Sequence, residues 1–299
     1  MTTKDADRII ACGEQLLDRL DQCDICPQEC GADRKAGETG QCGADQRLKI
    51  AAVNLHFGEE PPLSGTRGSG TIFLSGCSLA CLYCQNYPIS QQMVGTYFTI
   101  DQLVDKMFAL AAKGAHNINF VTPDHFFGHI ACAIGQAIKK GLKIPIVCNC
   151  SGWEKPETLR ILEGVFDIYL ADMRYNNDSL ARNYSGASRY KELNRAAIKE
   201  MHRQVGALKI DAEGIAVRGL LVRHLVLPDG ISGSKEIFKF LAEEVSVETY
   251  VSLMSQYFPA YQAPDHPQLS RRITPVEFDK AVEMFYNAGL KNGYIQEMD

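Results

Sequence analysis

The chain has 299 residues, of which 45% are hydrophobic and 22% charged, a composition typical of soluble globular proteins. Its formal net charge of −5 argues against a general nucleic-acid-binding protein, because such proteins need a basic surface to neutralise phosphates. The first residues, MTTKDADRII, contain early acids and no apolar core, unlike a signal peptide. No apolar run is long enough to cross a bilayer. We therefore expect a cytoplasmic protein with no membrane or nucleic-acid partner.

The elements are predicted in chain order from the spacing of apolar residues. An amphipathic helix is expected within residues 1–20, where Ile9, Leu16 and Leu20 recur at helical spacing. Residues 21–70 are rich in cysteine, glycine and charge and show little periodicity, which favours a loop-rich lead-in. From residue 71 onward, strand-like apolar runs alternate with helical patterns. The predicted strands are residues 71–76, 117–123, 143–149, 167–173, 218–228 and 249–257. The predicted helices are residues 99–113, 126–140, 155–165, 190–205, 233–244 and 275–288.

This alternation indicates a parallel sheet with right-handed crossovers. The strand runs are almost continuously apolar, as expected when both faces of a sheet are covered. We predict an α/β fold with two parts. Residues 71–299 form a partial (β/α)6 TIM-type barrel, and residues 1–70 form an N-terminal helix and Cys-rich extension. Polar stretches such as TPDHF, NCSGW, DMRY and LPDG follow the strands, so the active site is expected at the carboxyl ends of the strands.

The cysteines indicate metal or cluster chemistry. The chain has 11 of them, without an export signal, and most of those before residue 85 fall in two tight groups. Cys77, Cys81 and Cys84 form a CxxxCxxC motif directly after the first predicted strand of the barrel. Three thiolates on a four-iron cluster leave one iron free for a small molecule, whereas a closed structural site needs four protein ligands. The alternative is a zinc site that Cys42 or His56 completes.

The stretch CSLACLYCQN resembles the cluster motif of the radical S-adenosylmethionine superfamily, with Tyr83 at the aromatic position before the third cysteine. Most of the chain is similar to proteins related to pyruvate formate-lyase activating enzyme. The resemblance implies that Cys77, Cys81 and Cys84 ligate three irons of a 4Fe–4S cluster and that S-adenosylmethionine chelates the fourth. It also implies that one electron cleaves the sulfonium to a 5′-deoxyadenosyl radical, which abstracts hydrogen from a substrate.

The resemblance further implies a low-potential electron donor of the flavodoxin or ferredoxin type. It favours the glycyl loop of a glycyl-radical enzyme as the substrate, which would make the protein an activase of the oxidoreductase class. A different protein, a peptide or a small molecule is the alternative substrate, because fold and cluster motif do not determine it. An alternative from another class is a non-catalytic metal-binding or regulatory protein.

Residues at two strand ends are predicted to bind the cofactor. The superfamily usually has Gly-Gly-Glu-Pro after its second strand, where this chain has FVTPDHF. Thr122 and Asp124 are therefore expected to receive the methionine ammonium group, although either could simply cap a strand-to-helix turn. VCNCSGW resembles the TNG stretch of activating enzymes, so Asn149 and Ser151 are expected to contact cofactor or substrate.

Four residues on later strands complete the predicted cofactor site. Asp172 in LADMRY matches a D-x-K stretch of the family, with Arg174 in place of lysine. Asp172 is expected to hold a ribose hydroxyl or the ammonium group and Arg174 a carboxylate; the alternative is an ion pair that braces the barrel mouth. Arg223 and His224 are adjacent on one strand, so one should point into the barrel and the other towards the helices. Both are predicted to contact cofactor or substrate, while a core role is the alternative for His224.

A second site is predicted in the lead-in, where Cys23, Cys26, Cys30 and Cys42 lie in a glycine-rich stretch. Four cysteines so spaced suit either zinc or an auxiliary iron–sulfur cluster, and thiolate chemistry does not choose between them. The alternative is four free thiols. A metal here would order a segment that lacks a core of its own.

Overall fold

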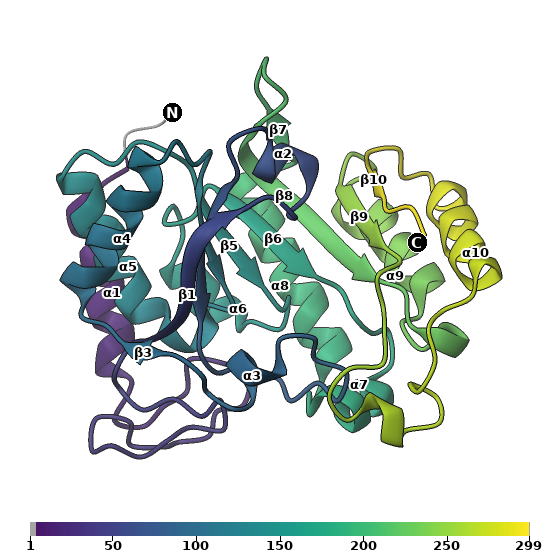
Figure 1. Ribbon diagram of the computed structural model, residues 1–299, viewed down its shortest axis with the longest axis horizontal. Helices are drawn as coiled ribbons and strands as arrows, with labels where there is room; N and C mark the ends of the chain where they lie inside the picture. Colours follow the sequence, from purple (N-terminus) through teal and green to yellow (C-terminus); the bar gives the residue numbers. More distant parts are fainter. Residues whose placement is uncertain (1–3, 299) are drawn as a thin grey trace.

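Parallel strands form the centre of the computed structural model, which describes residues 4–298 (Figure 1). Residues 1–3 and 299, at the ends of the predicted first helix and of the barrel segment, lie outside the described residues. The strands are β1 Lys49–His56, β2 Ser69–Leu74, β3 Thr96–Tyr97, β4 Ile118–Val121, β5 Ile146–Cys150, β6 Ile168–Asp172, β7 Lys209–Ile210, β8 Ala216–Leu225, β9 Tyr250–Met254 and β10 Gly293–Ile295. The helices are α1 Ala6–Asp18, α2 Pro61–Ser64, α3 Tyr87–Ser90, α4 Ile100–Ala112, α5 Phe127–Lys139, α6 Pro156–Ile161, α7 Asp178–Ser185, α8 Tyr190–Val205, α9 Ser234–Phe240 and α10 Pro275–Asn287.

The strand order is β10-β9-β8-β6-β5-β4-β2-β1-β3, and every pair from β2 to β10 along this path is parallel. The six predicted strands are confirmed as β2, β4, β5, β6, β8 and β9. The chain therefore has the α/β fold predicted for it, with a mostly parallel sheet of the partial-barrel type.

The expectation of a loop-rich lead-in is wrong for residues 49–56. This stretch is β1, which pairs antiparallel with β2 and covers the edge of the parallel sheet. β3 pairs in turn with β1. The run KIAAVNLH mixes polar and apolar residues because only part of it is buried, and this pattern concealed the strand.

All predicted helices form, and their sequence signals explain their ends. Thr99 and Gln102 make a capping box at the start of α4, and Thr274 and Glu277 make another at the start of α10. α9 ends in a π-helical turn at Leu241–Val245. α7 was not predicted; its polar sequence, DSLARNYS, carries little apolar periodicity.

Helix α1 packs against α5 on the outside of the sheet (Figure 1). The two helices approach closely at Gly13, where an added Cβ would lie 2.7 Å from the carbonyl oxygen of Gly128. The Cys-rich chain that follows α1 runs in loops towards the end of the molecule where α3 lies (Figure 1). This path brings residues 21–48 to the carboxyl ends of the strands.

The core has two parts, one on each face of the curved sheet. The larger part lies between the sheet and its helices. The smaller part includes Val147, Leu170 and Leu221 from the strands and Leu63 from α2. Two residues further along each strand, on the same face, come Asn149, Asp172 and Arg223. The inner face therefore changes from apolar to polar towards the carboxyl ends.

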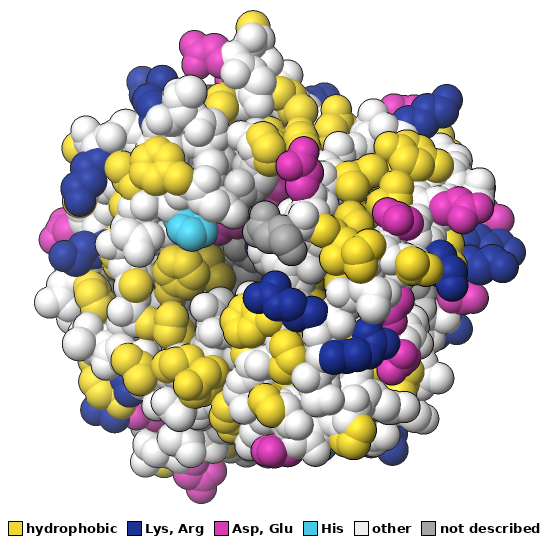
Figure 2. Space-filling model, turned by 45° about the vertical axis from the view of Figure 1, so that its right-hand side comes forward, with side chains coloured by type: hydrophobic (Ala, Val, Ile, Leu, Met, Phe, Trp, Pro, Cys, Tyr) yellow, Lys and Arg dark blue, Asp and Glu magenta, His cyan; other side chains and the backbone are white. Residues whose placement is uncertain are grey.

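No helix within residues 4–298 has the length and apolar character that a membrane span requires. On the face seen in Figure 2, acidic and basic side chains are interspersed around the rim. Neither sign of charge forms a continuous patch on this face.

Candidate active site

A cavity of about 750 Å³ opens at the carboxyl ends of the parallel strands. Small-molecule sites commonly have volumes of roughly 300–1,000 Å³, so a cofactor and part of a substrate fit here. The predicted residues that line it are Cys77, Thr122, Asn149, Ser151, Asp172, Arg174 and Arg223. The structure thus brings together residues that are far apart in the sequence.

The three-cysteine loop (residues 75–86) follows β2 and reaches the cavity at Cys77. Burial raises the pKa of both Cys77 and Cys81, while the Arg174 guanidinium opposes this rise for Cys81. The Cys81 sulfur lies 3.3 Å from Arg174 Nη1 and accepts a hydrogen bond of 3.0 Å from Ser185 Oγ. Donors placed on this sulfur stabilise its thiolate form, which is the form that binds metal.

A chain of hydroxyl groups leads to Cys81. The Tyr83 and Tyr175 hydroxyls are 2.6 Å apart, and the Tyr175 hydroxyl is 2.8 Å from Ser185 Oγ. Because Ser185 donates to the sulfur, each hydroxyl in the chain can donate to the next one towards Cys81. Tyr83 lines a smaller pocket beside the main cavity and is not among the residues that line the main cavity itself.

Within residues 4–298, no three His, Cys, Asp or Glu side chains gather around one point as they do on a single metal ion. A 4Fe–4S cluster makes a different demand, because each thiolate binds a different iron.

The turn after β4 separates two predicted residues. Thr122 lines the cavity and has a positive φ of 56°, a strained conformation for a β-branched residue. Its backbone N–H donates to the Asn149 carbonyl at 2.8 Å, which ties the turn to β5. Asp124 is buried behind the turn and pairs with His125 at 3.1 Å. It does not line the cavity.

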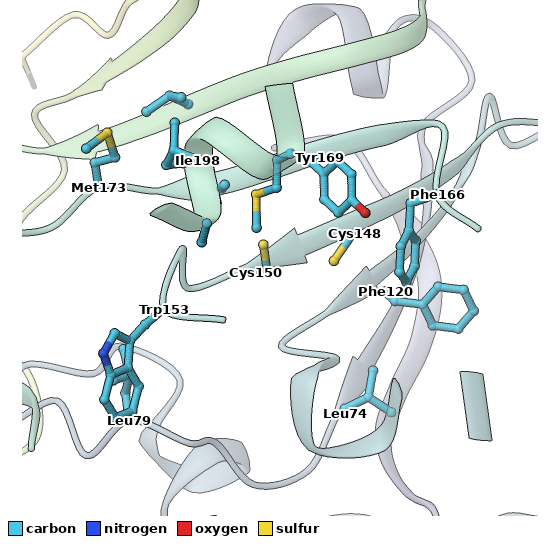
Figure 3. Packing of buried hydrophobic residues seen from close by; sticks show 14 of the residues in the cluster. Leu74, Leu79, Phe120, Cys148, Cys150, Trp153, Phe166, Tyr169, Met173 and Ile198 are labelled. Atoms are coloured by element: carbon cyan, nitrogen blue, oxygen red, sulfur yellow. The ribbon is translucent and has the colours of Figure 1, made fainter. Parts of the chain in front are cut away.

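Residues 149–151 lie at the end of β5, and all three line the cavity. Asn149 and Ser151 are the predicted site residues among them. Cys148 and Cys150 belong to the buried core, and Figure 3 shows them near Tyr169. Ser151 Oγ donates to Glu154 Oε1 at 3.1 Å.

Asp172 and Arg174 form an ion pair of 2.5 Å at the cavity wall. Arg174 therefore bridges the Asp172 carboxylate and the Cys81 sulfur. This is the bracing ion pair that the sequence left as an alternative. The remaining accessible surface of both side chains faces the cavity, so the pair can also meet a ligand.

Arg223 and His224 point in opposite directions, as predicted. Arg223 lies in the cavity. His224 is fully buried on the helix side, where its ring bonds the Met173 carbonyl at 2.7 Å and Ser234 Oγ at 2.9 Å. The structure therefore does not bring His224 to the cavity, and its partners are those of a core residue.

Two carboxylates at the cavity floor were not foreseen. Glu60 forms two hydrogen bonds with Arg223, of 2.6 and 2.7 Å, and Glu59 bonds the same guanidinium. Both acids come from the turn between β1 and α2, and their side chains are only 5% exposed. The signal was the pair of acids before two prolines in GEEPP, within a segment that was interpreted as loop.

A third unforeseen acid is Glu154, which is buried beside the cavity. Burial and the Asp124 carboxylate raise the pKa of Glu154 to about 8, while the Ser151 hydroxyl opposes the rise. Its Oε2 has no hydrogen-bond partner within the part of the chain that the structure describes. The geometry suits a protonated, neutral carboxyl group at pH 7.

Replacing Glu154 by Gln should make the protein less sensitive to alkaline pH. In the unfolded chain a Glu titrates near about pH 4.3. Between that pH and about 8, the native state of the wild type holds a proton that the unfolded chain lacks, so its free energy of unfolding falls as pH rises. Glu154→Gln removes this dependence. We expect it to gain about 1–3 kcal/mol relative to wild type between pH 5 and pH 8, measured by urea unfolding.

The exposed Glu157 supplies the control for this measurement. Glu157→Gln should leave the pH profile of the wild type unchanged, because that carboxylate is largely solvated. Unfolding profiles that run parallel for wild type and Glu154→Gln would show that Glu154 is ionised at pH 7.

No protein-family model matches the chain. The chain is 30% identical to the uncharacterized protein MJ0674 of Methanocaldococcus jannaschii over 276 residues, which cover 88% of this chain and 73% of that protein. The chain belongs to the family of MJ0674. A second protein of the same organism, the uncharacterized protein MJ0808, is 24% identical over 300 residues, which cover 94% of this chain and 83% of that protein.

Among solved structures, the fold is similar to that of the FeFe-hydrogenase maturase HydG. HydG from Carboxydothermus hydrogenoformans matches with a TM-score of 0.52 and 15% identity over 96% of this chain. Another HydG structure matches with a TM-score of 0.53 and 14% identity over 99% of this chain. The chain spans 66% and 64% of the length of these two proteins. The chain therefore shares its fold with these maturases.

Proposed function

We propose that the protein is a radical S-adenosylmethionine enzyme. The observation that carries the proposal is the position of the three-cysteine loop. It follows β2 at the carboxyl end of the sheet and opens at Cys77 into a cavity of about 750 Å³. The similarity of the fold to HydG supports the same conclusion.

The donor set suits a cluster with one open iron. Cys77, Cys81 and Cys84 would each hold one iron of a 4Fe–4S cluster. Arg174 and Ser185 would stabilise the Cys81 thiolate, and Ser90 Oγ, 3.1 Å from the Cys84 sulfur, would do the same there. When bound, the cluster would supply one electron to S-adenosylmethionine, whose 5′-deoxyadenosyl radical would abstract a hydrogen atom from the substrate.

The charges of the cavity suit this cofactor. The carboxylates of Glu59, Glu60 and Asp172 face the guanidinium groups of Arg174 and Arg223, so the acids outnumber the bases. S-adenosylmethionine carries a sulfonium and an ammonium group against one carboxylate and is therefore a net cation. A cavity with excess negative charge attracts such a ligand.

The polar residues at the strand ends would have different roles in binding the cofactor. Thr122, Asn149, Ser151 and Asp172 present oxygen and amide groups to the cavity and would bind its ammonium and hydroxyl groups. Arg223 is already held by Glu59 and Glu60, so we assign it to the cavity floor rather than to the methionine carboxylate. A flavodoxin- or ferredoxin-type protein would supply the electron.

We propose the glycyl loop of a glycyl-radical enzyme as the substrate, on the resemblance of the sequence to activating enzymes. The test uses a peptide whose glycine carries deuterium at Cα. Reduced, cluster-loaded protein and S-adenosylmethionine should transfer deuterium into 5′-deoxyadenosine, which mass spectrometry detects. A peptide with alanine in place of that glycine is the control. Formation of 5′-deoxyadenosine without deuterium would contradict the glycyl substrate and leave the cleavage reaction intact.

A further inference from the structure

Arg34 is a buried cation whose hydrogen bonds include no carboxylate. Its side chain is 0% exposed. Its guanidinium donates to the Asp45 carbonyl at 3.1 and 2.8 Å and to the His125 carbonyl at 2.9 Å. Its remaining hydrogen bond within residues 4–298 goes to the Cys23 sulfur at 3.7 Å. Because a buried charge needs compensation, this arrangement calls for an anion near Cys23.

The nearby Asp124 does not meet this need. Its carboxylate pairs with the His125 ring at 3.1 Å, and His125 Nε2 lies 2.8 Å from the Ser75 carbonyl. The His125 ring thus lies between the Asp124 carboxylate and the Ser75 carbonyl. Asp124 thus has a partner of its own.

Three buried thiols lie in the same segment as Arg34, and one of them, Cys23, contacts its guanidinium. Cys23, Cys26 and Cys42 are each at most 8% exposed, although they lie in a segment without regular secondary structure. Backbone bonds fold this segment back on itself, since Cys23 N donates to Ala32 O and Gly31 N donates to Cys23 O. The segment therefore buries polarisable sulfur where Arg34 requires negative charge.

Gly40 keeps the space between two of these sulfurs open. A Cβ added at Gly40 would lie 3.3 Å from the Cys30 sulfur and 3.3 Å from the Cys42 sulfur. Both sulfurs therefore border the same small volume next to Gly40. A side chain at this position would occupy part of it.

We propose that Cys23, Cys26, Cys30 and Cys42 hold a metal centre as thiolates and that Arg34 balances its negative charge. Four thiolates give a net negative centre with either one zinc ion or an iron–sulfur cluster. Thiolate ligands suit both kinds of centre, so the metal is left to the measurement. The proposal is independent of S-adenosylmethionine chemistry.

This centre would brace the three-cysteine loop. The Cys77 N–H donates to the Cys42 carbonyl at 3.3 Å, and Gln28 Nε2 donates to the Ser78 carbonyl at 2.9 Å. At Gly76, whose φ is +93°, an added Cβ would lie 2.5 Å from the Cys42 carbonyl oxygen. The two cysteine segments are thus in backbone contact.

The test measures metal in a full-length background variant with Cys77, Cys81 and Cys84 changed to Ala. We expect it to retain about one zinc or about four irons per chain, which elemental analysis distinguishes. In this background Arg34→Met should weaken metal retention against a chelator by about 10-fold or more, as for other residues that support ligands. Arg34→Lys should restore most of it, because the charge is kept. Arg47→Met, at an exposed arginine of the same segment, is the matched control and should change nothing.

Two results would overturn the proposal. A metal-free background variant would exclude the centre, and unchanged retention in Arg34→Met would exclude the role of Arg34. If these variants fail to fold, X-ray absorption of the wild type answers the first question. A zinc spectrum with four sulfur neighbours, or an iron content of about two 4Fe–4S clusters per chain, would support the centre. Iron for one cluster and no zinc would contradict it.

Discussion

Cys81→Ala should abolish the release of 5′-deoxyadenosine from S-adenosylmethionine while leaving the fold intact. The variant removes one of three iron ligands and the sulfur on which Arg174 and Ser185 converge. Cleavage needs the open iron of a complete cluster, so no partial activity is expected. The measurement is chromatography of 5′-deoxyadenosine after anaerobic reconstitution and reduction, with circular dichroism to verify folding.

Cys148→Ala provides the matched control for this experiment. Cys148 is equally buried, but it lies in the core on the helix side of β5. Its loss should cost about 1 kcal/mol of stability and leave cleavage near the wild-type rate. Full activity in Cys81→Ala, or equal loss in both variants, would show that the three-cysteine loop does not hold the catalytic cluster.

Arg223→Met should destabilise the protein by about 3–5 kcal/mol at pH 7, because it leaves the two buried carboxylates of Glu59 and Glu60 without their partner. Urea unfolding measures the loss. Arg218→Met is the control, since this arginine lies on the same strand and its guanidinium donates to a neutral group, the Gln204 carbonyl. Its replacement should cost about 1 kcal/mol or less.

The free energy of unfolding of Arg223→Met should also depend on pH in a direction that can be predicted. Burial would raise the pKa of Glu60, but Arg223 outweighs it and lowers the pKa. In the wild type, this carboxylate therefore stabilises the fold above its unfolded pKa of about 4.3, and the contribution is lost only as pH falls through the lower native pKa. Without Arg223, burial dominates and Glu60 takes up a proton more readily. The loss in free energy of unfolding caused by Arg223→Met should therefore shrink from pH 8 to pH 5. A loss that stays constant over this range would contradict the ion pairs of Arg223 at the cavity floor.

The barrel could be predicted from the sequence because its strands are buried on both faces. Runs such as INFV, IVCNC and IYLAD are almost wholly apolar, and capping boxes mark the starts of α4 and α10. β1 escaped prediction because one side of it is partly exposed and it lies in a Cys-rich segment. α7 escaped because it is polar and short.

The site was only half predictable, for a physical reason. Position along a strand end places Thr122, Asn149, Asp172 and Arg223 on one face. The partners of these residues come from turns. Turns carry no apolar periodicity, so their path cannot be predicted from the sequence. Glu59 and Glu60 reach the cavity floor through such a turn, and Glu154 lies in another.

Asp124 is the opposite case, a predicted site residue that the structure does not bring to the cavity. The sequence places it beside Thr122, two residues further along one turn. The positive φ of Thr122 redirects the chain there, so that Asp124 is buried behind the turn with His125. A residue count cannot foresee this change of direction.

The central claim is that the three-cysteine loop holds a cluster that cleaves S-adenosylmethionine. The most direct test is to incubate anaerobically reconstituted wild-type protein with S-adenosylmethionine and a low-potential reductant, and to measure 5′-deoxyadenosine over time. The account predicts product that accumulates with wild-type protein and is absent without reductant. A cluster-loaded, reduced sample that forms no 5′-deoxyadenosine would contradict the claim and favour a non-catalytic metal-binding protein.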